Sequence, residues 1–288
     1  MDKILLTGAG GFLLSRVYNY YKDRYEILPL KSRDLDITDS EKVCQSFMDF
    51  KPDYVIHGAA ISSTEVCRDN EKKAYKVNVE GTANVAMAAR KANAKLIYCS
   101  SEQIFNGNLE SGPYNEEDIP CPNTVYGKTK LEGEKKIAQV LNDAVIMRLT
   151  WLFSLPERNM RVNKNILWNV VSGMLKGEVV KLPSHEYRGH TYVYDLIQHI
   201  PDILNLPAGI YHTGSMNDES TYDVGVHILK TMGFKERADK LIQRDDERYK
   251  EKPRDIRIDT NKLASHGIKF ENTMDGIERA IKDFGLMF

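Results

Sequence analysis

Short apolar runs alternate with longer amphipathic stretches through the first half of the chain. Buried strands are predicted at residues 3–8, 25–30, 51–60, 94–101 and 143–153. Between them, apolar residues recur at helical spacing, which predicts helices over residues 12–25, 39–50, 71–93 and 129–142. Strands separated by helices of this length need crossover connections, so we expect a parallel α/β sheet that is doubly wound, with helices on both faces.

The alternation weakens after about residue 150. A helix is predicted over 166–177, a strand end followed by a helix over 189–204, and an extended piece with a short helix over 250–270. This pattern predicts a main lobe over residues 1–150, to which parts of 165–205 return. Residues 151–288 are then mainly a smaller C-terminal lobe, interleaved with the first.

Composition and charge exclude several classes of protein. Hydrophobic residues make up 42% and charged residues 28%, an ordinary globular balance. The net charge of -1 gives no basic excess for nucleic acid. The four cysteines form no C-x-x-C pair, which favours free thiols in the cytoplasm over disulfides or a metal site. No signal peptide or membrane-spanning run is present in the sequence, so we expect neither a membrane nor a nucleic-acid partner, with a homodimer as a possible assembly.

Ligands of such sheets bind beyond the C-terminal ends of the strands, and the first strand ends in a glycine-rich turn. Gly8, Gly10 and Gly11 would let the backbone approach a pyrophosphate at the N-terminus of the next helix. Leu14 stands where the third glycine of such a loop is expected, but that glycine serves helix–strand packing and not phosphate contact. On this motif alone, an ordinary strand–turn–helix is an equal alternative.

The next two strand ends carry further candidates. Lys31, Ser32 and Arg33 replace the carboxylate that would bind an adenosine ribose, and their cations could accept a 2′-phosphate. Asp34 and Asp36 lie close by in the sequence and would work against this. A solvated loop is the alternative. Small residues at 58–60 would let a flat ligand lie against the backbone, although small residues also occur wherever helices crowd a sheet.

Tyr126 and Lys130 follow the fourth strand, which ends in a serine pair at residues 100–101. Their spacing places both side chains on one face of a helix. A nearby ammonium is expected to lower the pKa of a tyrosine from its usual value of about 10 and so to favour acid–base catalysis. Tyr18 and Lys22 repeat the spacing, but within the first helix and away from any strand end.

The set of motifs, taken in order, resembles the extended short-chain dehydrogenase/reductases and, within them, the dTDP-4-dehydrorhamnose reductase (RmlD-like) family. The resemblance extends over nearly the whole chain. It rests on the segments at 7–16, 35–39, 51–60, 78–86, 100–107, 114–134, 147–151, 209–214 and 252–263.

This resemblance implies an NAD(P)-binding Rossmann domain over 1–150 and a substrate-binding lobe beyond it. It implies that Ser101, Tyr126 and Lys130 are catalytic, with Tyr126 as the acid–base group and Lys130 binding the nicotinamide ribose. It implies further cofactor-binding positions at Gly8, Gly11, Phe12, Leu13, Asp36, Ile37, Ala59, Ala60 and Asn78. The charge of the second strand end, described above, adds Lys31 and Arg33. Positions for the sugar are Glu102, Gln103 and Trp151. Ser101 could instead cap a turn, and Trp151 could be a core residue.

The implied activity is reduction of a keto group on a nucleotide-linked deoxysugar. The resemblance does not settle the cofactor, but the cations Lys31 and Arg33 predict that NADPH is preferred and that NADH is accepted. The chain departs from the family at two positions. Leu14 replaces the third glycine of the loop, and Gln103 stands where the reductases usually have tyrosine. Two alternatives follow: a sugar-nucleotide epimerase or dehydratase of the same superfamily, and a non-catalytic, nucleotide-binding regulatory subunit.

Overall fold

The protein divides into two compact units. The computed structural model describes residues 1–287. The first unit contains residues 1–108, 119–149 and 199–211, and the second contains 109–118, 150–198 and the chain from His212 onward. The sequence-predicted domain boundary at 150 stays a prediction, because a compact unit is not by itself a domain that folds alone.

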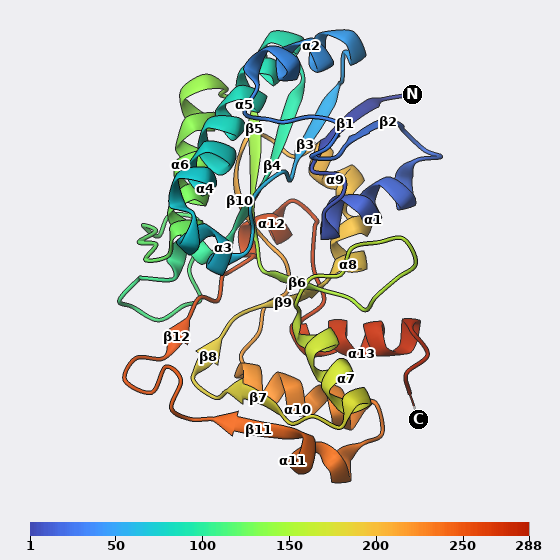
Figure 1. Ribbon diagram of the computed structural model, residues 1–288, viewed down its shortest axis with the longest axis vertical. Coiled ribbons are helices and arrows are strands. Elements are labelled where there is room, and N and C mark those ends of the chain that lie inside the picture. Colours follow the sequence, from blue (N-terminus) through green and yellow to red (C-terminus); the bar gives the residue numbers. More distant parts are fainter. Residues whose placement is uncertain (288) are drawn as a thin grey trace. The chain divides into compact units, whose positions relative to one another are not determined.

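A six-stranded sheet organises the first unit (Figure 1). Its strands are β1 (Lys3–Thr7), β2 (Glu26–Leu30), β3 (Tyr54–His57), β4 (Lys95–Ser101), β5 (Ala144–Leu149) and β10 (Gly209–Thr213), in the order β10-β5-β4-β3-β1-β2. Strand β1 pairs in parallel with both β2 and β3, and the parallel pairing continues through β4 to β5. The winding direction therefore reverses between β1 and β3, which confirms the doubly wound fold and marks its ligand-binding edge.

Helices cover both faces of this sheet. On one face lie α2 (Ser40–Phe50), α5 (Gly81–Ala92) and α6 (Val125–Val140), and on the other lie α1 (Phe12–Tyr21) and α9 (Ile200–Leu204) (Figure 1). Asp39 caps α2 by accepting a hydrogen bond from the Lys42 amide at 3.1 Å. The apolar stripe of α2, with Val43 and Phe47, packs into a core shared with α5 and the strands.

The predicted helix over 71–93 is not regular. It consists of α4 (Glu71–Tyr75), a π-helical turn η1 (Lys76–Glu80) and α5, preceded by the short α3 (Thr64–Asp69). Such wide turns occur frequently at functional sites. Here the turn contains Asn78, which is buried and bonded to two other segments of the chain.

The prediction of one strand over 143–153 is wrong in one respect, because this segment forms two strands. β5 ends at Leu149, and β6 (Trp151–Phe153) belongs to a separate two-stranded sheet with β9 (His190–Tyr192). Between them, the Thr150 amide donates to the carbonyl of Thr213 at 3.2 Å, and the Trp151 amide donates to the carbonyl of Gly189 at 3.2 Å. Apolar and polar residues keep alternating through Leu149, Thr150 and Trp151, so the pattern could not reveal the change of partner.

The second unit combines small sheets with helices around its own core. The other pairs are β7 (Val180–Pro183) with β11 (Ile242–Asp245) and β8 (Glu186–Tyr187) with β12 (Arg254–Asp255). Its helices are α7 (Ile166–Lys176), α8 (Val193–Gln198), α10 (Thr221–Thr231), α11 (Ala238–Leu241), α12 (Asn261–Ser265) and α13 (Thr273–Asp283). Phe153, Val170, Ile228 and Ile277 are buried in this core. Within residues 1–287, no helix combines the length and apolarity that a membrane crossing needs.

Candidate active site

The glycine-rich turn lies at the reversal point of the sheet. Gly8 has a φ of 82°, and a Cβ there would lie 2.6 Å from the Ala59 amide nitrogen. The end of β1 and the segment after β3 therefore approach closely only because residue 8 is glycine. Gly11 is the N-cap of α1, and no side chain among residues 1–287 caps this helix. Its first-turn amides are thus arranged as they are in anion-binding helices.

Leu14 occupies space that Gly58 leaves open. It is 2% exposed, and a Cβ at Gly58 would lie 2.8 Å from its Cδ1 atom. The missing third glycine of the loop is therefore compensated by a glycine on the facing segment. Gly58 serves helix packing, whereas Ala59 lies beside Gly8.

Phe12 and Leu13, both predicted for the pyrophosphate loop, are largely buried in the first turn of α1. The guanidinium of the fully buried Arg16 lies 4.2 Å from the centre of the Phe12 ring and donates to the Phe12 carbonyl at 2.8 Å. This contact fixes the start of the helix.

The segment after β2 places a cation beside the glycine-rich turn. The Lys31 side chain runs along Gly10, whose Cβ would lie 3.5 Å from the Lys31 Cγ atom. Asp34 accepts a hydrogen bond from the Lys31 amide at 3.0 Å and pairs with Arg33 at 3.5 Å. Asp36 accepts from the amide and hydroxyl of Thr38, both at 2.9 Å, and these bonds lower the pKa of Asp36. Both carboxylates are therefore engaged within their own loop.

Ile37 and Asn78 fix two other edges of the site. Ile37 is buried against α5, since a Cβ at Gly81 would lie 2.7 Å from its side chain. The Asn78 side chain accepts from the Ile61 amide at 2.8 Å and donates to the Ile61 carbonyl and to the Thr129 hydroxyl, both at 3.0 Å. Asn78 thus ties the segment that follows Ala59 and Ala60 to helix α6.

Ser101 and Tyr126 are brought together from β4 and the first turn of α6. A hydrogen bond joins their side chains. Ser101 also accepts from the Gln103 amide at 3.2 Å and so begins the 3₁₀ turn η2 (Glu102–Phe105). The capping role that the sequence offered as an alternative is therefore present together with the contact to Tyr126.

Lys130 lies one helical turn beyond Tyr126 and is 2% exposed. Its ammonium lies 4.0 Å from the centre of the Tyr98 ring. Burial lowers the pKa of Lys130 to about 8. Burial also raises the pKa of Tyr126 to about 12, against the opposing effect of the Ser101 hydrogen bond. The expectation of a lowered pKa for Tyr126 is therefore wrong, because the removal of the phenol from water raises this pKa by more than its neighbours lower it.

The three residues predicted to contact a sugar lie in different surroundings. Glu102 is fully buried in η2 and Gln103 is partly exposed there. Trp151, in β6 of the second unit, has the Arg188 guanidinium 4.6 Å from its ring centre and the His190 ring 5.4 Å away. Arg188 already covers one side of this indole, which limits the surface that Trp151 could offer to a ligand.

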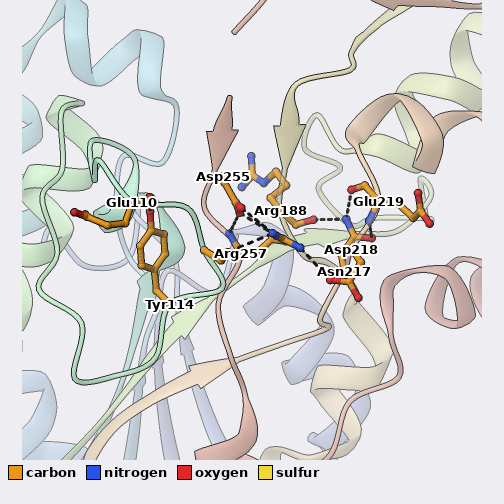
Figure 2. Close-up of polar contacts among 9 residues, drawn as sticks. Glu110, Tyr114, Arg188, Asn217, Asp218, Glu219, Asp255 and Arg257 are labelled. Atoms are coloured by element: carbon orange, nitrogen blue, oxygen red, sulfur yellow. Dashed lines mark hydrogen bonds and ion pairs between the residues drawn. The ribbon is translucent and has the colours of Figure 1, made fainter. Parts of the chain in front are cut away.

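A segment between Ser101 and Tyr126 in the sequence is anchored in the second unit (Figure 2). Arg257 donates to the Gly112 carbonyl at 3.3 Å while pairing with Asp255 at 2.8 Å and with Asp218 at 3.0 Å. The Tyr114 amide donates to the Arg257 carbonyl at 2.8 Å. The loop that separates two candidate catalytic residues is therefore held by β12 and the residues after it.

Sequence reasoning missed Tyr98, His57 and Arg257. His57 and Tyr98 are register partners on β3 and β4, and their rings stack at 5.5 Å. The available signal was a ring-bearing residue directly after the aliphatic pair of each strand, Val55–Ile56 on β3 and Leu96–Ile97 on β4. Arg257 had no signal beyond its place in a charged stretch.

A hollow of about 430 Å³ beside β5, β10 and the end of α6 contains none of the predicted site residues. Among residues 1–287, no group of three or more histidine, cysteine, aspartate or glutamate side chains is placed to hold a metal ion. Neither feature changes the location of the candidate site.

Comparison with known proteins gives relatives over most of the chain. Spore coat polysaccharide biosynthesis protein SpsK of Bacillus subtilis is 30% identical over 239 residues, which are 81% of each chain. The dTDP-4-dehydrorhamnose reductase of Aggregatibacter actinomycetemcomitans is 32% identical over 238 residues, 80% of this chain and 79% of its own. Methionine adenosyltransferase 2 subunit beta of Bos taurus is 26% identical over 280 residues, 92% and 83% of the two chains.

Solved structures share the fold. The dTDP-4-dehydrorhamnose reductase of Bacillus anthracis, in complex with NADP, matches with a TM-score of 0.85 at 24% identity over 98% of each chain. The Bordetella bronchiseptica enzyme WbmG, in complex with NAD, matches with a TM-score of 0.82 at 20% identity over 99% of this chain and 95% of its own. The sequence pattern of the RmlD substrate binding domain matches residues 1–286. Since this match extends over almost the entire chain, the protein belongs to the RmlD family.

Proposed function

We propose that this protein is an NAD(P)H-dependent oxidoreductase that reduces a keto group on a nucleotide-linked deoxysugar. The observation that carries the proposal is the hydrogen bond between Ser101 and Tyr126, with Lys130 one turn further along the same helix. Family membership and the reductases among the relatives support the same chemistry.

The first unit fits a nicotinamide dinucleotide. Gly8 lets the turn approach the facing segment closely, and the N-terminus of α1, which no side chain of the described residues caps, offers backbone donors to a pyrophosphate. Ala59 and Ala60 form the opposite wall, and Asn78 holds the segment that contains them. The bound reduced nicotinamide supplies the hydride.

Tyr126 then donates the proton that the substrate oxygen needs. With its pKa raised to about 12, this residue is a neutral phenol throughout the physiological range and always carries the proton. Donation leaves a phenolate, which a hydrogen bond from Ser101 and the positive charge of Lys130 stabilise. Because Lys130 is buried, little water surrounds its ammonium to weaken this attraction to the phenolate.

The protein uses NADPH in preference to NADH and accepts both. The support is Lys31, which lies against the glycine-rich turn, while Asp34 and Asp36 accept hydrogen bonds inside their own loop. A relative of known structure binds NADP and another binds NAD.

The substrate class is a nucleotide sugar, and Glu102, Gln103 and Trp151 remain the proposed contacts to its sugar. A cytoplasmic location is part of the proposal, because the four cysteines of the chain are free thiols. A homodimer also stays a prediction, which light scattering of the purified protein would test.

The decisive experiment is turnover with a panel of keto-sugar nucleotides and each reduced cofactor. Net oxidation of NADPH with formation of the hydroxy sugar is expected. Isomerised sugar without net cofactor oxidation would instead identify an epimerase.

A regulatory subunit is the second candidate. It is favoured by the relation to a methionine adenosyltransferase subunit over 92% of this chain. Cofactor binding without turnover of any panel member would support this candidate and contradict the reductase assignment.

A further inference from the structure

The environment of Lys130 is unusual for a buried cation. Lys130 is 2% exposed, and within residues 1–287 it makes no ion pair or hydrogen bond with another side chain or carbonyl. The face of the Tyr98 ring lies 4.0 Å from its Nζ atom. Glu134, on the same helix, is paired with Arg148 at 2.9 Å.

The Tyr98 ring is fixed on the strand side. It stacks on His57 at 5.5 Å with an interplanar angle of 28°. The His57 Nδ1 atom lies 2.6 Å from the Thr7 hydroxyl, and its Nε2 atom lies 3.0 Å from the Thr82 hydroxyl. Because Thr82 donates its own proton to the Asn78 carbonyl at 2.7 Å, its oxygen accepts the proton of Nε2. Burial lowers the pKa of His57 to about 3, so the ring is neutral near pH 7.

The tyrosine is also confined on the helix side. A Cβ at Gly133 would lie 2.6 Å from the Tyr98 hydroxyl oxygen. The hydroxyl end of Tyr98 therefore packs against Gly133 of α6, and Lys130 of the same helix lies over the face of its ring. A ring held in this way defines one position for the ammonium.

We propose that Tyr98 is a positioning residue that holds Lys130 as a cation over its ring and leaves the ammonium's N–H groups available for the cofactor ribose and the Tyr126 phenolate. A carboxylate in place of the Tyr98 ring would also stabilise the positive charge of Lys130, but it would do so by accepting hydrogen bonds from those same N–H groups. An aromatic face attracts the cation through its quadrupole and needs no conventional hydrogen bond. This inference rests on the proposed catalytic role of Lys130.

The groups that face Lys130 are few and mostly neutral. They are His57 on β3, Cys67 on α3, Tyr98 and Cys99 on β4, and Glu134 on α6. Burial and Lys130 lower the pKa of His57 to about 3, and burial raises the pKa of Cys99 to about 11. Both are therefore uncharged near pH 7. Because the Tyr98 ring stabilises the charged form of Lys130, weakening its attraction for the ammonium should lower the pKa of Lys130 further.

The test replaces Tyr98 without changing its shape. Tyr98→Phe retains the ring, and phenylalanines with one, two and three fluorines are then placed at position 98 by stop-codon suppression. Each fluorine weakens the attraction of the ring for a cation. NADPH dissociation constants and the alkaline limb of kcat/KM are measured, with thermal melting as the check on folding. The same fluorinated residues at Phe47, which is buried and has no cation over its ring among residues 1–287, are the matched control.

Tyr98→Phe should stay within about threefold of the wild type in NADPH affinity. Across the fluorinated series we expect NADPH binding to weaken by about 2-fold to 30-fold and the alkaline limb to move down by about 0.4 to 1.5 pH units. In a Lys130→Met background, fluorination should have no further effect on affinity, and the Phe47 series should change neither quantity.

Two results would overturn the inference, and they can be told apart. If Lys130→Met impairs binding and turnover but fluorination at position 98 changes neither affinity nor the pH limb, Tyr98 is only a core residue. If Lys130→Met itself retains NADPH affinity and turnover, the proposed role of Lys130 fails, and the role of Tyr98 fails with it.

Discussion

At the scale of single residues, Ser101 combines a structural role with a proposed chemical one. Its oxygen accepts the Gln103 amide, and its side chain also bonds Tyr126. A hydroxyl has two lone pairs and one proton, so accepting from the backbone leaves the proton for Tyr126. The cap of η2 therefore orients the side chain for which a role in the reaction is proposed.

Tyr126→Phe should remove most turnover and leave cofactor binding intact, because only the transferable proton is lost. We expect kcat to fall by about 10²-fold to 10⁴-fold, with the NADPH dissociation constant nearly unchanged. The measurement is steady-state kinetics beside a fluorescence titration. Tyr18→Phe, at the second tyrosine–lysine spacing, is the control and should be fully active. Retention of more than about a third of wild-type activity by Tyr126→Phe would refute the assignment.

Lys130 should set the alkaline limit of the reaction. Its pKa of about 8 means that the charge is present below that pH and is lost above it. We therefore expect kcat/KM for reduction to decline as pH rises through about 8, with no contribution from Tyr126, whose pKa is about 12. A pH–rate profile of the wild-type enzyme checks this, and a rate that stays constant to pH 10 would contradict it.

Lys31 should govern the choice of cofactor. A charge-assisted hydrogen bond to a 2′-phosphate contributes about 1.5–3 kcal/mol, so Lys31→Ala should weaken NADPH by roughly 10-fold to 100-fold and leave NADH unchanged. Arg33→Ala should have a smaller effect, because Arg33 is 79% exposed and pairs with Asp34. Dissociation constants of both reduced cofactors at two salt concentrations measure this. Equal salt slopes for the two cofactors would exclude a phosphate site here.

At the scale of elements, the packing of α1 on the sheet depends on one complementary pair. Leu14 fills the space above Gly58, so a large residue on the helix and a small one after β3 replace the arrangement with glycine on the helix. The helix N-terminus, which is the part that would meet a phosphate, keeps its glycines. The two functions of the motif are therefore separable.

Because Leu14 and Gly58 pack together, the effect of Gly58→Ala on the free energy of unfolding should change sign when Leu14 is replaced. Leu14→Gly should lower the free energy of unfolding by about 3–6 kcal/mol, from lost burial and helix propensity together, and leave the catalytic step unchanged. Gly58→Ala should destabilise the wild type, where its methyl group meets Leu14, but stabilise the Leu14→Gly variant by about 1 kcal/mol. Denaturant unfolding of the four proteins measures this. The same sign in both backgrounds would show that the two positions do not interact.

At the scale of the whole molecule, each unit contains a fully buried neutral histidine. Burial lowers the pKa of both His57 and His190 to about 3, with Lys130 and Arg188 adding to the effect. The unfolded chain binds these protons near pH 6.5, so the unfolded state gains protons first as pH falls. Each histidine should therefore cost about 1.4 kcal/mol of stability per pH unit between pH 6.5 and about 3.

His190→Phe separates this effect from packing. Both ring nitrogens of His190 are buried without a hydrogen-bond partner among residues 1–287, so replacing the ring by phenyl should cost little at pH 7. We expect the melting temperature to fall less between pH 7 and pH 4.5 than in the wild type. An equal fall in the two proteins would show that His190 does not contribute to acid unfolding.

The sequence by itself determined the alternation of strands and helices, the family and the order of the strand-end motifs. Periodicity is a local property of the chain, and each motif lies within a few neighbouring residues, so both can be read without coordinates. Gly8, Tyr126 and Lys130 could be proposed for this reason. Their catalytic and binding roles remain predictions that the experiments above test.

Only the tertiary structure decided which distant residues meet. The pairing of Leu14 with Gly58, the stack of His57, Tyr98 and Lys130, and the anchoring of the 109–118 segment by Arg257 join positions far apart in the chain. The direction of the pKa shift of Tyr126 also could not be predicted from the sequence. A lysine four residues away can be seen there, but the exclusion of water that outweighs its charge depends on everything packed around the phenol.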